Sequence, residues 1–237
     1  MLIAVYNLKG GVGKTTTVVN LAFASAQSGA RTLIWDLDAQ AAATYYLRLK
    51  PSLDKGSKGL FAKKKGAFKE VCSSEIHNLY AIPADYSLRK IDQHLKNQKG
   101  FASAVKPLSK AFDAVLFDCP PMAGAAIEDL LGVVDAVVVP LIPTTLSMRT
   151  FHQMKQKLAH PKTLPFFNLV DRRKRMHRDI CEYARLNDEG FLETIIPSAS
   201  DIEKMGLECA PLGVFASNSP LVRSYQLLWD EIVRAAF

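Results

Sequence analysis

Residues 9–16 read KGGVGKTT, and this stretch decides the fold. The apolar run Leu2–Tyr6 precedes it, and Lys14–Ser28 follows it with apolar side chains at helical spacing. Strand, glycine-rich loop and helix in this order predict a turn whose backbone N–H groups converge on phosphate oxygens. A glycine turn without a ligand would leave the flanking strand, the helix and the Gly-Lys-Thr ending unexplained together.

A phosphate loop assigns separate tasks to its last residues. We expect Lys14 to reach the β and γ phosphates and the Thr15 hydroxyl to ligate Mg²⁺. The strict pattern G-x-x-x-x-G-K-[ST] fails here, because its first glycine position holds Leu8 and an additional lysine, Lys9, precedes the glycines. The predicted nucleotide-binding residues of the loop are Lys9, Gly10, Gly11, Val12, Gly13, Lys14, Thr15 and Thr16.

Further short apolar runs resemble the first and are mostly separated by segments long enough for a helix. They are Thr32–Trp35, Leu79–Ile82, Ala114–Phe117, Ala136–Val139, Phe166–Val170 and Thr194–Ile196. Continuous apolar runs are typical of parallel strands covered on both sides. The sequence therefore predicts an α/β fold of the P-loop NTPase type, with a mostly parallel twisted sheet covered by helices on both faces.

Three aspartates follow predicted strands and are candidates for metal binding and catalysis. Asp36 and Asp38 end the second strand, and Asp118 ends the strand Ala114–Phe117. A single aspartate at such a position can be a turn former. Three of them beside a phosphate loop favour a site that holds Mg²⁺ and positions water, because parallel strands end at one edge of the sheet.

Composition and charge narrow the class of protein. The chain has 237 residues, of which 49% are hydrophobic and 22% are charged. This composition predicts one folded domain over residues 1–237 and excludes the class of disordered tail proteins. A net charge of +7 and a pI near 9.2 favour an acidic partner such as nucleic acid. Four widely spaced cysteines predict neither zinc nor disulfides, and we expect a cytoplasmic protein without a signal peptide.

Two other segments have a distinct composition. Lys55–Lys69 holds six lysines, three glycines and no acid, which predicts a mobile, solvated connection. Leu221–Phe237 carries large apolar residues at helical spacing, which predicts a helix that docks against the core.

The loop with its additional lysine resembles the deviant Walker A motif of the ParA/MinD family of ATPases. The likeness continues through DLDAQ, VLFDCPP, NLYAIPADYSL, FFNLVDRR and TIIPSASDIEKM and covers nearly the whole chain. In that family two subunits enclose two ATP molecules. The resemblance implies that Lys9 reaches the partner's nucleotide, that Asp38 orients the attacking water, and that Asp36 and Asp118 surround Mg²⁺.

The resemblance also implies finer contacts to the nucleotide. Thr16 would contact the α-phosphate, and Asn168 and Pro197 match positions that hold the adenine. The chain departs from the family pattern at Ala39 and Ala41, where a proline and a glycine are usual, and at Ser198, where a basic residue is common.

Leu8, the C-terminal segment and a basic cluster favour the short ParA branch, which lacks an N-terminal helix-turn-helix. The cluster comprises Arg172, Arg173, Lys174, Arg175 and Arg178, with Arg223 added by analogy. Such a surface holds the DNA backbone without reading sequence. A solvated helix face is the simpler alternative. Asp230 and Glu231 argue against a membrane-targeting helix at the C-terminus, so no stable membrane anchor is expected.

We therefore expect an ATP-dependent dimeric switch that binds DNA nonspecifically, associates with the nucleoid and positions a plasmid, chromosome or protein assembly. A ParB-like or other adaptor would stimulate hydrolysis. The alternatives are a MinD-like membrane-associated regulator, a metabolic or metal-carrier P-loop enzyme, and a nucleotide-locked DNA-binding module without useful hydrolysis.

Overall fold

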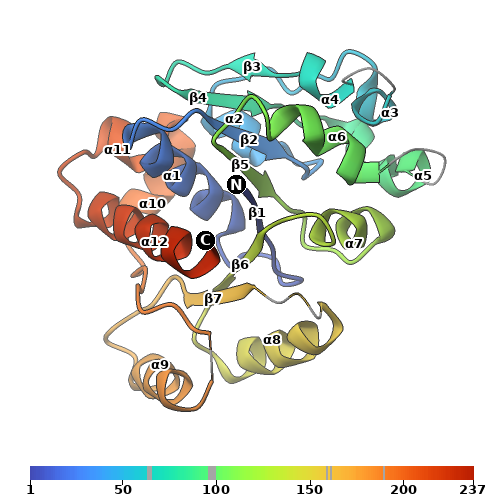
Figure 1. Cartoon of the computed structure of the whole chain (residues 1–237). Helices are drawn as coiled ribbons and strands as arrows, with labels where there is room; N and C mark the ends of the chain where they lie inside the picture. Colours follow the sequence, from blue (N-terminus) through green and yellow to red (C-terminus); the bar gives the residue numbers. More distant parts are fainter. Residues whose placement is uncertain (63–65, 96–99, 159, 161, 189) are drawn as a thin grey trace.

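A twisted sheet forms the centre of the computed structural model, which describes residues 1–62, 66–95, 100–158, 160, 162–188 and 190–237. The sheet has the order β3-β4-β2-β5-β1-β6-β7 (Figure 1). All neighbouring strands pair in parallel except β3, which is antiparallel to β4. The strands are β1 Leu2–Val5, β2 Thr32–Asp36, β3 Cys72–Ser73, β4 Leu79–Ile82, β5 Ala114–Asp118, β6 Ala136–Leu141 and β7 Thr163–Phe167. The predicted α/β architecture is confirmed.

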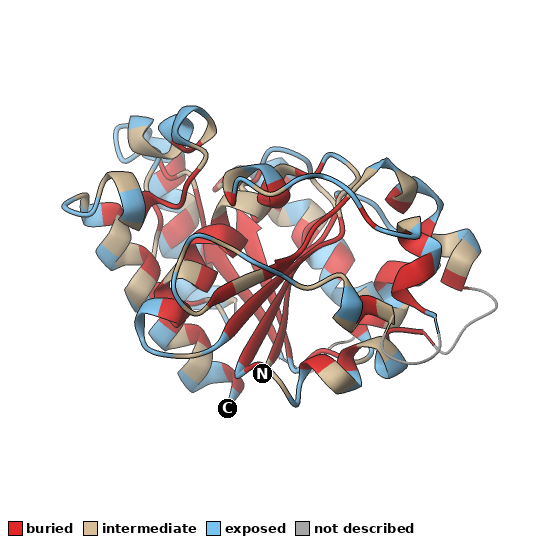
Figure 2. Ribbon diagram, turned by 90° about the horizontal axis from the view of Figure 1, so that it is seen from above, coloured by how far each residue is buried: buried red, intermediate tan, exposed pale blue. Residues whose placement is uncertain are grey.

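Helices cover both faces of this sheet (Figures 1 and 2). One face packs against α1 Lys14–Gln27, α2 Ala42–Tyr46, α10 Ser200–Glu208, α11 Leu212–Phe215 and α12 Pro220–Ala236. The other packs against α3 Gly56–Leu60, α4 Gly66–Lys69, η1 Tyr86–Lys90, α5 Ile91–Leu95, α6 Gly100–Leu108, α7 Ala125–Leu131, α8 Thr145–Leu158 and α9 Arg175–Asn187.

Side-chain alternation along β1 shows why its sequence is apolar throughout. Leu2 and Ala4 face the core beneath α6–α8, whereas Ile3 and Val5 face the core beneath α1 and α12. Both sets are buried, so the strand needs apolar residues at every position. This burial fixes β1 in the middle of the sheet and places the loop that follows it at the carboxyl edge.

The predicted strand boundaries near the C-terminal half need correction. The strand predicted at Phe166–Val170 begins earlier, at Thr163, and ends at Phe167. The strand predicted at Thr194–Ile196 was wrong. That segment runs beside β7 without forming a regular strand: the Ile196 N–H donates to the Phe167 carbonyl at 3.0 Å, and an isolated bridge between Val170 and Pro197 follows. The backbone N–H groups of residues 193 and 194 donate to the Glu231 carboxylate on α12, so they are not available to β7.

The lysine-rich segment Lys55–Lys69 is also different from the prediction, although its residues 63–65 lie outside the described part of the chain. Its apolar residues Leu60, Phe61 and Ala67 are buried in the core beneath α6. The Ser57 hydroxyl donates to the Ser87 carbonyl at 2.8 Å. The described residues therefore pack against the core and cover part of the sheet. The burial of a few apolar side chains is enough to hold the segment there, although most of its other residues are lysines and glycines.

The predicted C-terminal docking helix is confirmed as α12, which lies beside α1. Leu221, Tyr225, Leu228, Trp229 and Ile232 are buried between α12, α1 and the sheet. No helix in the described ranges combines the length and the apolar character needed to cross a membrane.

Candidate functional site

Two glycines give the loop between β1 and α1 its shape. Gly11 and Gly13 have φ values of 73° and 83°, in the left-handed region that glycine adopts most easily. A Cβ at Gly13 would lie 2.4 Å from the Asn168 Nδ2 atom. Helix α1 then begins at Lys14 with no side-chain cap and no acidic residue in its first turn. Its first N–H groups and its dipole therefore favour an anion at this point.

Lys14 lies at the base of the loop and is 7% exposed. Its Nζ atom donates to the Lys9 carbonyl at 3.1 Å. Burial lowers the pKa of Lys14, and the charges of Asp118 and Asp38 oppose this shift. The ammonium group is thus held between the loop backbone and the carboxylates that follow β2 and β5, where a phosphate oxygen would meet it.

Asp36 is held firmly at the end of β2. It is 1% exposed, and its Oδ2 atom accepts the Thr44 N–H at 2.9 Å and the Thr44 hydroxyl at 2.7 Å. Its Oδ1 atom accepts the Asp38 N–H at 3.1 Å. Burial raises the pKa of Asp36 to about 6 despite these hydrogen bonds. Thr44 was not predicted, because only the folded chain brings α2 against β2.

Asp118 is aligned with Asp36 across neighbouring strands and is fully buried. Neither of its carboxylate oxygens has a hydrogen-bond partner of standard geometry among the described residues. Burial, and secondly the charge of Asp36, raise the pKa of Asp118 well above its ordinary value, while the nearby Thr15 hydroxyl and Lys14 oppose this. Two adjacent buried carboxylates beside a threonine hydroxyl fit a divalent cation.

The oxygen donors at the ends of β2 and β5 and at the start of α1 are too few to hold a metal by themselves, but they suit Mg²⁺. Within the described ranges no group of three or more His, Cys, Asp or Glu residues could hold a metal ion. Mg²⁺ usually keeps several waters and is held by one or two carboxylates together with substrate phosphates. Thr15, Asp36 and Asp118 supply such a partial set.

The two predicted catalytic residues outside the loop base lie at the rim of the site. Asp38 is half-buried, and its Oδ1 atom accepts the Gln40 N–H at 2.9 Å. Lys9 is half-buried, its N–H donates to Asn7 Oδ1 at 2.9 Å, and its ammonium makes no ion pair within the described residues. Both side chains are therefore accessible to a molecule that approaches the carboxyl edge.

The two predicted adenine positions have well-defined surroundings. Asn168 is 1% exposed, and its Nδ2 atom donates to the Val12 carbonyl at 2.8 Å, so it braces the phosphate loop from β7. Its Oδ1 atom has no hydrogen-bond partner in the described part of the chain. Pro197 pairs with Val170 beyond the end of β7. Their adenine contacts stay a prediction, as does the contact of Thr16 with the α-phosphate.

The basic cluster is exposed and its backbone is braced by its own side chains. Arg173 donates two hydrogen bonds to the Asp171 carboxylate, each 3.0 Å long, which hold the pKa of Asp171 at about 2. Arg178 donates to the Arg172 carbonyl at 2.6 Å. The Asp171 N–H donates to Nδ1 of the buried His177 at 3.1 Å, a contact that the sequence did not predict.

These contacts divide the cations of the basic cluster into two groups. Some are engaged in hydrogen bonds or ion pairs within the cluster, and others have side chains that are free to bind a ligand. Arg175 pairs with Asp179 at 3.5 Å on α9. The side chains of Arg172 and Lys174 have no ion pair or hydrogen bond among the described residues. Arg223 is exposed on α12, and no described contact joins it to the cluster. The structure therefore brings together five of the six predicted DNA-binding residues.

A glycine-rich loop after a central parallel strand, with buried carboxylates ending the neighbouring strands, defines a P-loop nucleotide-binding protein. A family model described as an AAA domain matches residues 1–164. The chromosome-partitioning ATPase Soj of Treponema pallidum is 28% identical over 242 residues, covering 96% of this chain and 94% of that protein. The chain belongs to the ParA/MinD family of partitioning and positioning ATPases.

Solved structures show the same architecture. Cobyrinic acid a,c-diamide synthase from Mycobacterium smegmatis, with bound ATP analog and magnesium, is 26% identical with a TM-score of 0.78, covering 98% of this chain and 94% of that one. The cell division ATPase MinD of Pyrococcus furiosus has a TM-score of 0.81 at 22% identity, covering 99% of both chains. The likeness to MinD concerns the fold.

Proposed function

We propose that residues 1–237 act as one ATPase domain that dimerises with ATP, binds DNA nonspecifically and positions an intracellular cargo. The observation that carries this proposal is the exposed, braced basic cluster beyond β7, which follows the same sheet edge as the phosphate loop. Nucleotide and DNA would thus occupy neighbouring parts of one edge. The working place would be the cytoplasm, on the nucleoid.

The residues of the site would divide the chemistry of ATP hydrolysis. Lys14 and the first turn of α1 would hold the β and γ phosphates. Thr15, Asp36 and Asp118 would hold Mg²⁺, which supplies charge neutralisation on the phosphates. Asp38 would orient the attacking water. Lys9, whose ammonium makes no described ion pair, would stabilise the transition-state charge on the nucleotide of the partner subunit.

The free cations of the cluster suit the DNA backbone. Arg172 and Lys174 need not break an ion pair to reach a phosphate, and the bonds of Arg173 and Arg178 hold the turn that presents them. Binding of this kind releases counterions, so its affinity falls steeply with salt and does not depend on base sequence. A ParB-like or other adaptor is the proposed activator of hydrolysis.

The test is DNA binding by the purified protein with ATP, with ADP and without nucleotide, at rising salt. Arg172→Gln/Lys174→Gln removes two free cations, and the matched control Lys106→Gln/Lys110→Gln removes two exposed lysines from the α6 region. We expect ATP-dependent binding whose salt slope falls by about two in the first variant only. Equal loss in both variants, or binding with ADP as tight as with ATP, would contradict the proposal.

Membrane association is disfavoured by the position of α12. A MinD-like regulator of the kind considered above needs a terminal helix whose apolar side is free to enter a bilayer. Leu228, Trp229 and Ile232 are instead buried against the rest of the molecule. Liposome flotation with ATP checks this, and we expect the protein to stay with the soluble fraction.

A further inference from the structure

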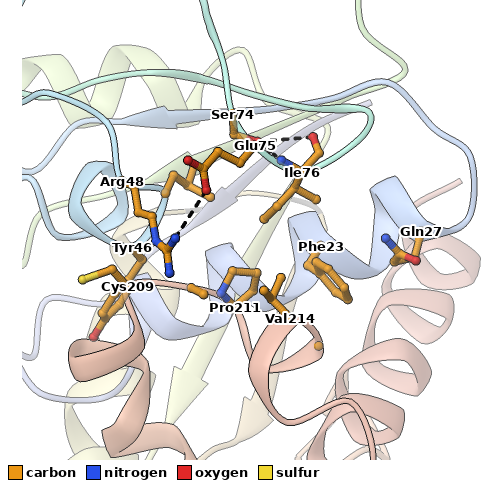
Figure 3. A pocket seen from close by; sticks show the side chains of 13 residues that line it. Phe23, Gln27, Tyr46, Arg48, Ser74, Glu75, Ile76, Cys209, Pro211 and Val214 are labelled. Atoms are coloured by element: carbon orange, nitrogen blue, oxygen red, sulfur yellow. Dashed lines mark hydrogen bonds and ion pairs between the residues drawn. The ribbon is translucent and has the colours of Figure 1, made fainter.

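Two adjoining cavities lie on the outer side of α1, away from the phosphate loop. The first, of about 400 Å³, is bounded by α1, α11, the end of α2 and the turn before β4 (Figure 3). The second, of about 710 Å³, lies between α1, α11 and the start of α12. Phe23, Gln27 and Gly213 line both cavities. Volumes of this size suit small-molecule ligands.

Charge distinguishes the two cavities. At the mouth of the first, Arg48 and Glu75 form an ion pair of 3.4 Å, as Figure 3 shows, so its charge is balanced. Arg223 is the one charged residue among the described residues that line the second. Arg223 has no ion pair or side-chain hydrogen bond within the described ranges. Asp201, which accepts the Ser219 hydroxyl at the edge of the cavity, is already paired with Lys204 at 3.1 Å.

The rest of the second cavity combines apolar and uncharged polar side chains. Its apolar lining is Phe23, Ala24, Pro220, Val222 and the ring of Tyr225, and its uncharged polar lining is Asn20, Gln27, Ser217, Asn218, Ser219 and Gln226. An open cavity with an apolar wall, uncharged polar groups and one unpaired cation at its edge is complementary to a molecule with an apolar body and an anionic head. We propose that this cavity, named here the α1–α12 cavity, is a binding site for an amphipathic anion that Arg223 recognises.

The wall of the α1–α12 cavity also holds the helix of the phosphate loop. Asn20 is buried in this wall, and its Nδ2 atom donates to the Thr16 carbonyl at 2.8 Å. Its Oδ1 atom accepts the Leu212 N–H of α11 at 3.0 Å. A ligand between α11 and α1 therefore stabilises the observed arrangement, in which Lys14 donates to the Lys9 carbonyl. Ligand binding in the cavity is consequently coupled to nucleotide binding at the loop.

Decanoate is the probe, with the uncharged decanol as its chemical control. Titration calorimetry is carried out on the wild-type chain, on Arg223→Gln and on the matched variant Arg48→Gln from the mouth of the first cavity. We expect one decanoate per chain, about tenfold weaker binding in Arg223→Gln, and no change in Arg48→Gln. Decanol binding should not depend on Arg223.

Several outcomes would overturn the site. They are an absence of decanoate binding to the wild type, equal affinities in wild type and Arg223→Gln, or equal losses in both arginine variants. If Arg223→Gln weakens DNA binding while decanoate affinity is unchanged, Arg223 belongs to the DNA surface instead. Val222→Phe, which fills the cavity from its half-exposed wall, should also weaken decanoate binding while circular dichroism shows an intact fold.

The effect on nucleotide is measured separately and rests on the proposed function. With saturating decanoate we expect ATP affinity to change about fivefold, and to change less in Arg223→Gln at the same decanoate concentration. An unchanged ATP affinity would remove the regulatory role. A chain that binds decanoate through Arg223 but never binds ATP would contradict the proposed function and leave the cavity assignment intact.

Discussion

At the scale of single residues, the site places two buried carboxyl groups next to each other, and a bound cation would reduce the cost of ionising them. Asp36 and Asp118 are aligned on neighbouring strands, both are buried, and burial raises the pKa of each. Thr44 satisfies Asp36, whereas Asp118 has no partner of standard geometry among the described residues. A protein selected for stability alone would not place an unpaired carboxylate there, so the arrangement points to metal binding.

The first prediction replaces Asp118 with asparagine. Asp118→Asn removes a buried carboxylate but keeps its shape, so we expect the metal-free protein to gain about 1–3 kcal/mol in unfolding free energy at pH 7. ATP turnover should be lost. Because the pKa of Asp118 is raised by folding, its folded form binds protons more tightly than the unfolded chain. Wild-type stability therefore falls as pH rises above about 4, where the unfolded carboxyl ionises, and the advantage of Asp118→Asn grows.

Chemical denaturation at a series of pH values measures this difference. The exposed Asp179→Asn on α9 serves as the control and should leave stability within about 0.5 kcal/mol of the wild type. A stability difference between Asp118→Asn and wild type that shrinks with rising pH would contradict the electrostatic account.

The second prediction concerns the backbone of the loop. Gly13→Ala places a Cβ 2.4 Å from Asn168 Nδ2 at a φ of 83°, so we expect a loss of about 1–3 kcal/mol in unfolding free energy. Gly10→Ala is the control, because a Cβ there meets nothing within 4 Å. Thermal denaturation without nucleotide separates the two. Equal stabilities of Gly13→Ala and Gly10→Ala would show that the loop rearranges to accommodate the added methyl group.

At the scale of elements, α12 holds in place the segment Thr194–Ile196, which its apolar sequence wrongly predicted to be a strand. The Glu231 carboxylate accepts the N–H groups of residues 193 and 194, so side-chain hydrogen bonds replace part of a strand ladder at the β7 edge. Hydrophobic periodicity and local composition cannot reveal this contact, because both describe residues that are close in sequence. Glu231 is 38 positions from Glu193.

The third prediction tests this anchor. Glu231→Ala leaves two N–H groups without their acceptor, and we expect a loss of about 1–2 kcal/mol in unfolding free energy. Asp230→Ala changes the neighbouring exposed carboxylate, which accepts from Gln226, and should cost less than about 0.5 kcal/mol. Urea denaturation monitored by tryptophan fluorescence gives both values. Equal losses would show that the segment docks without the carboxylate.

The elements predicted well are those with local causes. The strand, loop and helix around residues 9–16, the aspartates at strand ends and the apolar side of α12 all follow from patterns within a few residues. The prediction that Lys55–Lys69 is a mobile, solvated connection was wrong. Lysines outnumber the apolar residues in this segment, yet the burial of Leu60, Phe61 and Ala67 determines how its described part packs. Asn168 contacts Val12 across 156 positions, which no single-sequence pattern encodes. Thr44 and His177 contact partners only eight and six positions away, but across turns whose geometry the residue pattern does not show.

At the scale of the whole molecule, the carboxyl edge of the sheet is suited to form one side of the dimeric active site proposed above. Lys14, Asp36 and Asp118 lie deep at this edge, whereas Asp38 and Lys9 are half-buried at its rim. A rim lysine without an ion pair among the described residues is suited to a nucleotide held by another subunit. Two-fold symmetry would then give each nucleotide Asp38 from one chain and Lys9 from the other.

The fourth prediction distinguishes action of Lys9 on the partner's nucleotide from action on its own. Lys9→Ala and Asp38→Ala should each abolish stimulated ATP turnover while retaining ATP binding. In an equal mixture, half of the dimers are mixed, and each mixed dimer has one nucleotide with an intact Asp38 and an intact Lys9 from the other chain. We therefore expect the mixture to regain roughly a quarter of wild-type turnover. If Lys9 acts within its own chain, neither nucleotide in a mixed dimer has both groups, and the mixture stays as inactive as its components.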